Sequence, residues 1–311
     1  MTTHFKTYDQ VGKKEDISDV ISNIAPTQTP FQSLIGDEGA DNTLYQWQED
    51  DLSAVKDNAA VEGADATDED MTPTVMRSNV TQIFTKTIKV SATSDRVKTY
   101  GRAKETAYQL GKKSMELKRE MEYALIGKAQ NAVVGTSATA RKFGNVFGLD
   151  AAGTAMISPT VTVDHTATPA ALTEADVLTV NQKLYENGAD AKFIMIKPAD
   201  SLIVAGFASS AGREKQIPNE DRKIVNVVDV YVSPFGEQKV VLNRFMKADS
   251  SLVFDPSNWK KRTLRPTTRT LLAKTGDADR HFVVTEWGVQ HSNYKATGLI
   301  KGLSGTNPML P

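Results

Sequence analysis

The sequence predicts an α+β fold with a long projecting hairpin, and three observations lead to this prediction. Residues 102–126 carry the clearest helical periodicity of the chain. Residues 170–245 alternate between helix and strand patterns, which indicates a mixed domain. Residues 37–95 are acidic and strand-patterned, yet they contain too few apolar side chains to bury themselves. With 311 residues, 40% of them hydrophobic, the chain is long enough for one large domain or two ordinary ones.

The composition argues against several functional classes. There is no cysteine, so the chain can form no disulfide, thiolate nucleophile or zinc–thiolate site. The formal net charge of −1 argues against a protein whose main task is to bind nucleic acid. No segment approaches the ~18 apolar residues that span a bilayer, and residues 1–10 lead into no apolar run. We therefore expect a soluble protein that starts in the cytoplasm and contacts no membrane.

Residues 1–42 are expected to form an arm. Within them, residues 16–24 predict a short helix, because four apolar side chains recur at helical spacing: Ile17, Val20, Ile21 and Ile24. Pro26 and Pro30 then favour extended backbone, since a proline disfavours the helical conformation of the residue before it.

Residues 43–95 are interpreted as an extended hairpin. Thr43, Tyr45 and Trp47 share one parity of the first flank. In the second flank, residues 81–93, the apolar side chains also fall on one parity: Phe84, Ile88, Val90 and Ala92. Two strands joined by a long tip follow from this pattern.

The tip of the hairpin is strongly acidic. Residues 49–70 contain a single base, Lys56, and have a local formal charge of −8 from nine acids: Glu49, Asp50, Asp51, Asp57, Glu62, Asp65, Asp68, Glu69 and Asp70. Composition alone favours a solvated loop, whereas the strand-patterned flanks favour a segment that another copy of the chain covers. The carboxylates lack the spacing of a folded calcium loop.

Residues 102–126 predict a helix that would act as a structural spine. About 25 residues at 1.5 Å per residue give a length of about 37 Å. Small and apolar side chains recur on one face in steps of three and four: Ala103, Ala107, Leu110, Ser114, Leu117, Met121 and Ala124. Lys112 with Glu116, and Lys118 with Glu122, are expected to form ion pairs on the outer faces.

The rest of the chain predicts a loop followed by alternating elements. Residues 129–169 are rich in small residues, Gly and Thr, and indicate little regular structure. Thr173 is a predicted helix N-cap with Asp176 three places on, and Asn187 with Gly188 closes that helix. Further elements are expected at 192–196, after Pro198, at 224–232, at 238–242, at 252–255, at 264–272 and at 281–287, the last three against the spine helix.

No pattern indicates catalysis or a bound cofactor. A phosphate-binding loop and a nucleophile elbow are both absent from the sequence. The nearest candidate for a metal site is Glu286 with His281 and His291, but His281 and Glu286 have opposite strand parity. A structural role for the Glu286 carboxylate is therefore expected, and we expect no enzyme activity, metal or cofactor.

A basic run complements the acidic tip. Residues 260–274 contain no acid and carry a local charge of +6 from Lys260, Lys261, Arg262, Arg265, Arg269 and Lys274. The run fits a solvated strand edge, a phosphate-facing patch, or a seat for the acidic loop of a neighbouring copy. Interleaved aromatic side chains for base stacking are missing. The first and third interpretations remain open.

Many short strings, in order along nearly the whole chain, resemble a family of tailed-bacteriophage major capsid proteins. The N-terminal half contributes residues 16–24, 26–31, 47–48, 62–65, 79–84 and 116–122. The C-terminal half contributes Tyr231, residues 235–236, Arg244, residues 264–266, residues 274–277 and Glu286.

The resemblance implies the Hong Kong 97-like capsid fold. Its expected parts are an N-arm at 1–42, an extended loop at 43–95, a peripheral domain at 96–169 and 246–311 with a spine helix at 102–127, and an axial domain at 170–245. The implied function is a virion shell of pentamers and hexamers around double-stranded DNA that is enclosed without sequence-specific binding. A scaffolding protein, a portal and a decoration protein are implied partners, with assembly in the bacterial cytoplasm.

Two alternatives remain from the sequence, namely a cellular nanocompartment shell of the same fold and a tail-adaptor or DNA-binding structural protein. For the capsid interpretation, the residues expected between subunits are the loop acids Glu49, Asp50, Asp51, Asp57, Glu62, Asp65 and Asp68, and the bases Arg102, Lys112, Lys113, Lys118, Lys260, Lys261, Arg265 and Arg269.

Overall fold

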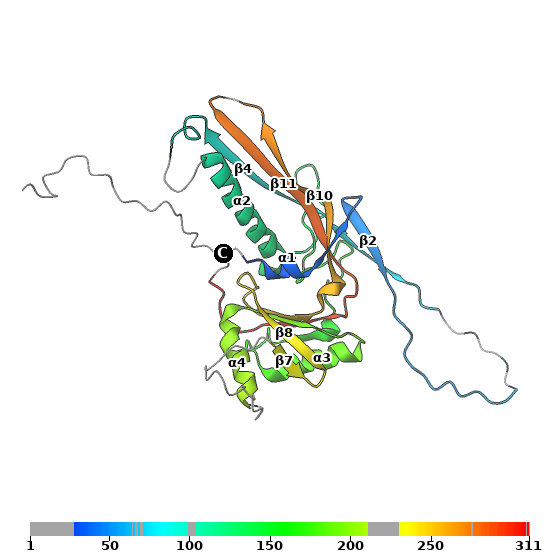
Figure 1. Ribbon diagram of the computed structural model, residues 1–311. Coiled ribbons are helices and arrows are strands. Elements are labelled where there is room, and N and C mark those ends of the chain that lie inside the picture. The colour runs from blue at the N-terminus through cyan, green and yellow to red at the C-terminus, as the bar shows by residue number, and fades with distance from the viewer. Residues whose placement is uncertain are drawn as a thin grey trace, which may run out of the picture.

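The computed structural model describes residues 28–63, 65, 68, 71–98, 104–210, 230–274, 276–308 and 310 (Figure 1). The predicted helix at 16–24 lies outside these residues. The helices are α1 Pro30–Leu34, α2 Glu105–Glu122, α3 Glu174–Glu186 and α4 Ser201–Ser210, with a π-helical turn at Tyr123–Gly127 and short 3-10 turns at Pro159–Val161, Pro198–Asp200 and Pro256–Asn258. The strands are β1 Gly36–Gly39, β2 Leu44–Glu49, β3 Val75–Val80, β4 Gln82–Ser91, β5 Thr162–Asp164, β6 Phe193–Ile196, β7 Val230–Ser233, β8 Gly236–Leu242, β9 Ser250–Phe254, β10 Trp259–Leu272, β11 Ala278–His291 and β12 Thr297–Lys301.

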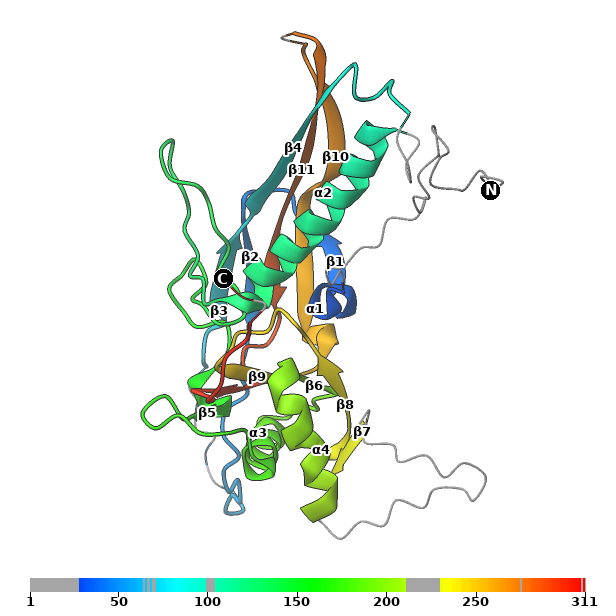
Figure 2. The same cartoon turned by 90° about the vertical axis from the view of Figure 1, so that its left-hand side faces the viewer.

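A four-stranded sheet with the order β1-β10-β11-β4 forms one half of the molecule. Strands β10, β11 and β4 are antiparallel neighbours, and β1 joins β10 in parallel. Helix α2 lies along one face of this sheet (Figure 2). Phe84, Ile88 and Val90 are buried on that face, so the predicted parity of this strand is confirmed.

A six-stranded sheet with the order β5-β12-β9-β6-β8-β7 forms the other half, with α3 packed against it. Strand β9 pairs with β6 in this sheet, so the expectation that residues 252–255 pack with the spine helix is wrong. The cause is that Leu252, Val253 and Phe254 are all fully buried, which requires a central strand covered on both faces. The domain boundaries expected from the sequence stay predictions.

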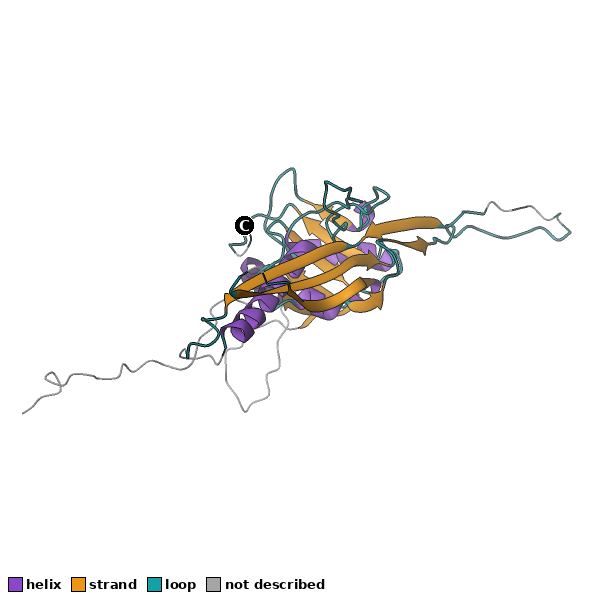
Figure 3. Ribbon diagram, turned by 90° about the horizontal axis from the view of Figure 1, so that it is seen from above, coloured by secondary structure: helices purple, strands orange, loops and turns teal. Residues whose placement is uncertain are grey.

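The extended hairpin exists, but its second strand is not the predicted one. Strand β2 pairs with β3 over six residues, from Leu44 opposite Val80 to Glu49 opposite Val75. Strand β4, which the sequence predicted as the partner, instead pairs with β11. The apolar face of β4 packs against aromatic side chains of β11, since the Phe84 and Trp287 rings stack with their centroids 5.2 Å apart. Figure 3 shows the loop between β2 and β3 projecting away from the body.

Pro30 begins a helix, which corrects the prediction of extended backbone at this position. Proline fits the first turn of a helix because its fixed φ is preset and its missing N–H would have had no helical partner. The next residue, Phe31, is fully buried and packs against Phe254 of one sheet and Trp259 of the other, with ring centroids at 5.4 and 5.8 Å. Helix α1 is therefore a wedge between the two sheets.

The spine helix is confirmed in type and position, and its regular α-helical part begins at Glu105 and ends at Glu122. The predicted stripe is buried only toward its C-terminal end, where Leu117, Met121 and Ala124 lie in the core, whereas Ala107 is exposed. The predicted pair of Lys118 with Glu122 is wrong, because Glu122 is fully buried and accepts backbone hydrogen bonds.

Two further predictions about local structure are confirmed. Thr173 and Asp176 form a capping box at the start of α3, and Gly188 follows its end with φ +73°. Residues 129–169 carry little regular structure, yet side chains such as Asn145 hold them in place. The Asn145 amide is buried and donates to the carbonyls of Ala124 and Lys128 at 2.8 and 2.6 Å.

Candidate functional site

The root of the extended loop is built around one buried guanidinium. Arg77 on β3 is 2% exposed, and its Nε donates to Glu49 on β2 at 3.2 Å. Its Nη1 donates to Asp150 at 3.0 Å, and its Nη2 to the carbonyl of Ala155 at 3.0 Å. The guanidinium also lies 4.6 Å from the centre of the Tyr294 ring. A charge buried this deeply is tolerated because two carboxylates and a carbonyl pair with it.

Two more side chains, Tyr45 on β2 and Asn79 on β3, join these strands to β11 of the four-stranded sheet by hydrogen bonds. The hydroxyl of Tyr45 donates to the carbonyl of Val289 at 2.7 Å. The Asn79 amide donates to the carbonyls of Val289 and Gly144 at 2.8 and 2.9 Å, and its oxygen accepts from the Gly144 N–H at 2.8 Å. The body end of the hairpin is therefore fixed by buried hydrogen bonds.

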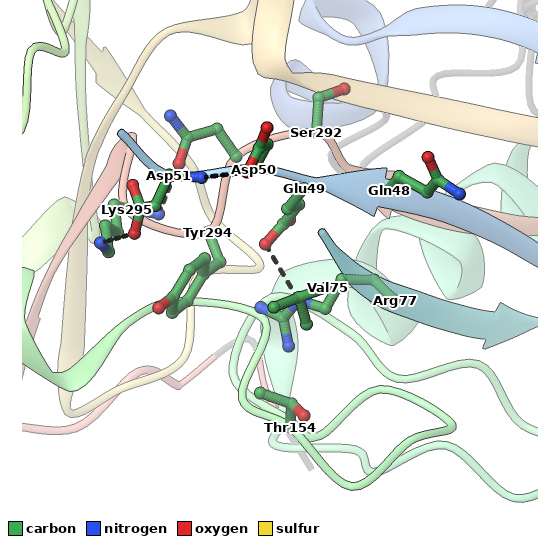
Figure 4. Close-up of a pocket in the computed structure, with 11 residues that line it drawn as sticks. Gln48, Glu49, Asp50, Asp51, Val75, Arg77, Thr154, Ser292, Tyr294 and Lys295 are labelled. Carbon is green, nitrogen blue, oxygen red and sulfur yellow. Dashed lines mark hydrogen bonds and ion pairs between the residues drawn. The ribbon is translucent and has the colours of Figure 1, made fainter. Parts of the chain in front are cut away.

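A cavity of about 350 Å³ opens beside this root (Figure 4). The cavity is lined by the carboxylates of Glu49, Asp50 and Asp51 and by the cations Arg77 and Lys295. Lys295 pairs with Asp51, and that hydrogen bond raises the pKa of the Lys295 amine above its ordinary value. Both side chains are accessible to solvent, so this ion pair contributes little to the stability of the root.

Beyond the root, the loop is exposed wherever it is described. Leu52, Val55, Val61 and Met71 are 80–102% exposed, so the described part of the chain does not cover these apolar side chains. The predicted contact residues on this part are exposed as well: Asp50, Asp57, Glu62, Asp65 and Asp68. The large apolar side chains of this segment are therefore open to solvent in the single chain.

Much of the basic run is neutralised within its own chain, which the sequence did not foresee. Strand β1 places Asp37 and Glu38 beside it in parallel register. Lys260 pairs with Glu38 at 2.9 Å, and Lys261 pairs with Asp37 at 3.1 Å. Hydrogen bonds from Lys260 and then Arg262 hold the pKa of the Glu38 carboxyl below its ordinary value. The two acids are neither on the loop nor in the local sequence, so no charge count pointed to them.

Further along the run, Arg265 donates to Glu286 at 2.8 Å, and Glu286 also accepts from Thr81 at 2.9 Å. The expectation that Glu286 is a structural carboxylate is therefore confirmed. Arg269 is exposed and its guanidinium lies 3.2 Å from Nδ1 of His281.

The basic residues expected on the spine helix have different surroundings. Arg102 lies outside the described residues. Lys113 pairs with Glu116 at 2.7 Å and lowers the pKa of that carboxyl. Lys112 and Lys118 are exposed and make no hydrogen bond or ion pair with the described part of the chain. The predicted Lys112–Glu116 pair is replaced by the Lys113 contact.

Several residues that shape this region were missed at the level of sequence. Arg77, Asp150 and Lys295 belong to no motif, and the only local signal was the polar string of Arg77, Ser78 and Asn79 within a strand. In the described ranges no group of three or more histidine or acidic side chains is placed to hold a metal ion. Nor is any helix described in the structure long and apolar enough to cross a membrane.

Comparison with known proteins gives close and distant relatives. The family model described as SU10 major capsid protein matches residues 1–304. The chain is 34% identical over 344 aligned positions to the major capsid protein of Escherichia phage Phieco32, covering 97% of this chain and 98% of that one. Among solved structures, the capsid of Cyanophage A-1(L) matches with a TM-score of 0.70 at 12% identity, over 96% of this chain and 99% of that one.

An encapsulin complex from Synechococcus elongatus also matches, with a TM-score of 0.58 at 9% identity over 98% of this chain and 97% of that one. An identity this low shows the shared Hong Kong 97-like fold alone, so it does not favour a nanocompartment over a phage shell. The family match over nearly the whole chain and the identity to a phage protein both point to the virus. The chain therefore belongs to the SU10 major capsid protein family: it is a major capsid protein of a phage and forms the capsid shell.

Proposed function

We propose that copies of this subunit associate into pentamers and hexamers that close into an icosahedral head around double-stranded DNA. The DNA is enclosed without sequence-specific binding, and association needs no catalytic step. Assembly takes place in the cytoplasm of a bacterial host, with a scaffolding protein, a portal and a decoration protein as partners. The family match and the likeness to assembled phage capsids support this proposal.

The observation that carries the proposal is the projecting loop. Leu52, Val55 and Val61 are 80–102% exposed, and the described part of their own chain does not cover them. A soluble single chain rarely leaves several large apolar side chains together in water, and such exposure marks a surface for a partner. A neighbouring subunit would bury these side chains and supply cations for the acids between them.

The charges select the surfaces that the loop would meet. Lys112 and Lys118 on α2, and Arg269 on β10, are the exposed bases among the predicted contacts that form no hydrogen bond or ion pair with an acid in the described part of their own chain. Lys260, Lys261 and Arg265 already pair with their own acids, so they would serve a neighbour only as shared partners. Such contacts give register and partner choice more than affinity.

A charge swap tests this placement. The double variant Lys112→Glu and Lys118→Glu should stay folded by circular dichroism and yield no closed particles by negative-stain electron microscopy. Adding Asp57→Lys and Glu62→Lys to the same chain should restore particles, because the pairs then form with inverted charge. Normal particles from the double variant would contradict the placement.

A second measurement separates a phage head from a cargo compartment. Particles recovered from infected cells should contain nuclease-protected double-stranded DNA. An enclosed enzyme in place of DNA would favour the nanocompartment alternative.

A further inference from the structure

We infer that Arg77 is a positioning residue that fixes the direction in which the extended loop leaves the body, meaning the two larger sheets and the segments packed on them. The direction of the loop in turn sets the register of one subunit on the next, and this statement about register rests on the proposed function. The direction of the loop is a property of the single chain and can be measured without assembly.

The contacts of Arg77 join the loop to the body. Nε holds Glu49, the last residue of β2, at 3.2 Å, while Nη1 and Nη2 hold Asp150 and the carbonyl of Ala155, both at 3.0 Å. The guanidinium is a rigid planar fork, so its donors keep fixed angles to one another. Asp150 and the Ala155 carbonyl belong to the body and orient the guanidinium, so the remaining donor, Nε, determines where the Glu49 carboxylate lies.

The body side of this contact is itself preorganised. Asp150 accepts the N–H groups of Ala152 and Thr154 at 2.9 and 2.8 Å through Oδ1, which leaves Oδ2 for Arg77. The Ala151 N–H donates to the carbonyl of Ser78 at 2.8 Å, so the turn is also bonded to β3. The side chain of Asp150 is fully buried, and this platform is not free to rearrange.

The firm attachment of the loop ends at Glu49. Glu49 and Val75 form the last pair of the β2–β3 ladder. Beyond it, Asp51 forms an ion pair with Lys295, and Asp51 is 69% exposed. An exposed pair contributes roughly 0–1 kcal/mol, so it adds little to the constraint that the Arg77 contacts place on the loop at its root.

A small change at the root has a large effect at the tip. An extended segment of 12 residues reaches about 40 Å, so a rotation of about 10° at the root displaces its far end by about 7 Å. That displacement exceeds the length of any hydrogen bond or ion pair. The contact between Arg77 and Glu49 therefore determines where on a neighbour the loop acids arrive.

Spin labels can measure the direction directly, since the chain has no cysteine of its own. Val55→Cys on the loop and Gln182→Cys on α3 are both exposed positions for labels. In dilute, unassembled subunit, double electron–electron resonance should give one narrow distance distribution. Glu49→Ala, which removes the loop side of the contact, should lose that single peak and give a broad distribution. Arg77→Met and Arg77→Lys should do the same, because lysine keeps the charge and not the fork.

Glu62→Ala is the matched control, because it removes the same charge from the same loop without touching Arg77. It should keep the narrow peak. An unchanged distribution in Glu49→Ala would overturn the inference, and so would equal broadening in Glu62→Ala, since charge alone would then set the direction. If Arg77→Met does not fold, Glu49→Ala still decides the question.

The assembly readout separates the two hypotheses. Glu49→Ala should lose closed particles of wild-type size, although the subunit keeps the circular dichroism spectrum of the wild type. Wild-type protein that forms no shells would contradict the proposed function and leave the spin-label test of Arg77 intact. Normal particles from Glu49→Ala, together with a broad loop distribution, would overturn the link to subunit register.

Discussion

The carboxylate of Glu122, at the end of the spine helix, accepts the backbone N–H of Phe31 at 2.8 Å across 91 residues of sequence. Its second oxygen accepts the N–H of Gln32 at 3.0 Å, and Asn243 donates to the first oxygen at 2.6 Å. One buried side chain therefore caps α1 and joins it to both halves of the molecule. Burial raises the pKa of the Glu122 carboxyl, and the three donors oppose that rise.

Replacing Glu122 by alanine should lower the free energy of unfolding by about 2–4 kcal/mol, because three donors, two of them in buried hydrogen bonds, lose their acceptor. Chemical denaturation followed by circular dichroism measures this change. Glu120→Ala is the control on the same helix, since the Glu120 side chain is 51% exposed and pairs with Lys86 at the surface. A loss in Glu120→Ala as large as that in Glu122→Ala would show that helix propensity, and not the cap, explains the effect.

His291 should make the subunit sensitive to acid. Its Nδ1 donates to the Met156 carbonyl at 2.7 Å, its Nε2 accepts from the Thr297 hydroxyl at 2.9 Å, and Thr297 accepts from the Trp259 indole N–H at 2.9 Å. Burial lowers the pKa of His291 from 6.5 to about 3. The unfolded chain therefore binds a proton before the folded chain does, so stability falls as the pH falls from 6.5 toward 3.

The His291→Gln variant provides the test of this acid sensitivity. Wild type should lose up to about 1.4 kcal/mol per pH unit in this window relative to the variant, because glutamine does not titrate. Urea unfolding at pH 7 and pH 4 measures both proteins. Equal slopes for wild type and His291→Gln would show that other groups cause the acid sensitivity.

Gly288 should tolerate no side chain, because a Cβ at this position of β11 would meet the Tyr45 hydroxyl and the Val80 carbonyl. Gly288→Ala is expected to destabilise the fold by about 1–3 kcal/mol, since both contacts lie at the fixed root of the hairpin. Thermal unfolding measures the loss. Limited proteolysis should also cut the root strands faster than in wild type, and an unchanged cutting pattern would argue against strain at the root.

Gly111 should respond in the opposite direction. It lies within α2, is exposed, and a Cβ there would meet nothing within 4 Å. Gly111→Ala is therefore expected to raise the free energy of unfolding by about 1 kcal/mol through helix propensity alone. A lower melting temperature in this variant would show that Gly111 needs a conformation or a contact that alanine cannot provide.

The basic run shows why local formal charges in the sequence predicted only part of the site. Residues 260–274 and 49–70 have opposite charge in the sequence, which suggested that they meet between subunits. The fold instead places Asp37 and Glu38 in register with Lys261 and Arg262, 224 positions further along the chain, and the side chains of Lys260 and Lys261 pair with these two acids. A parallel pairing between such distant strands leaves no trace in local spacing.

The sequence by itself determined what depends on near neighbours along the chain. The spine helix, the capping box of Thr173 and Asp176, the strand parity of Phe84 and Ile88, and a loop too acidic to bury itself all follow from spacings of two to four residues and from composition. Only the tertiary structure decided which strand pairs with which, and that Glu122 and Arg77 are buried. The physical reason is that a charge is buried where distant donors or acceptors converge on it, and Arg77 and Asp150 are 73 residues apart.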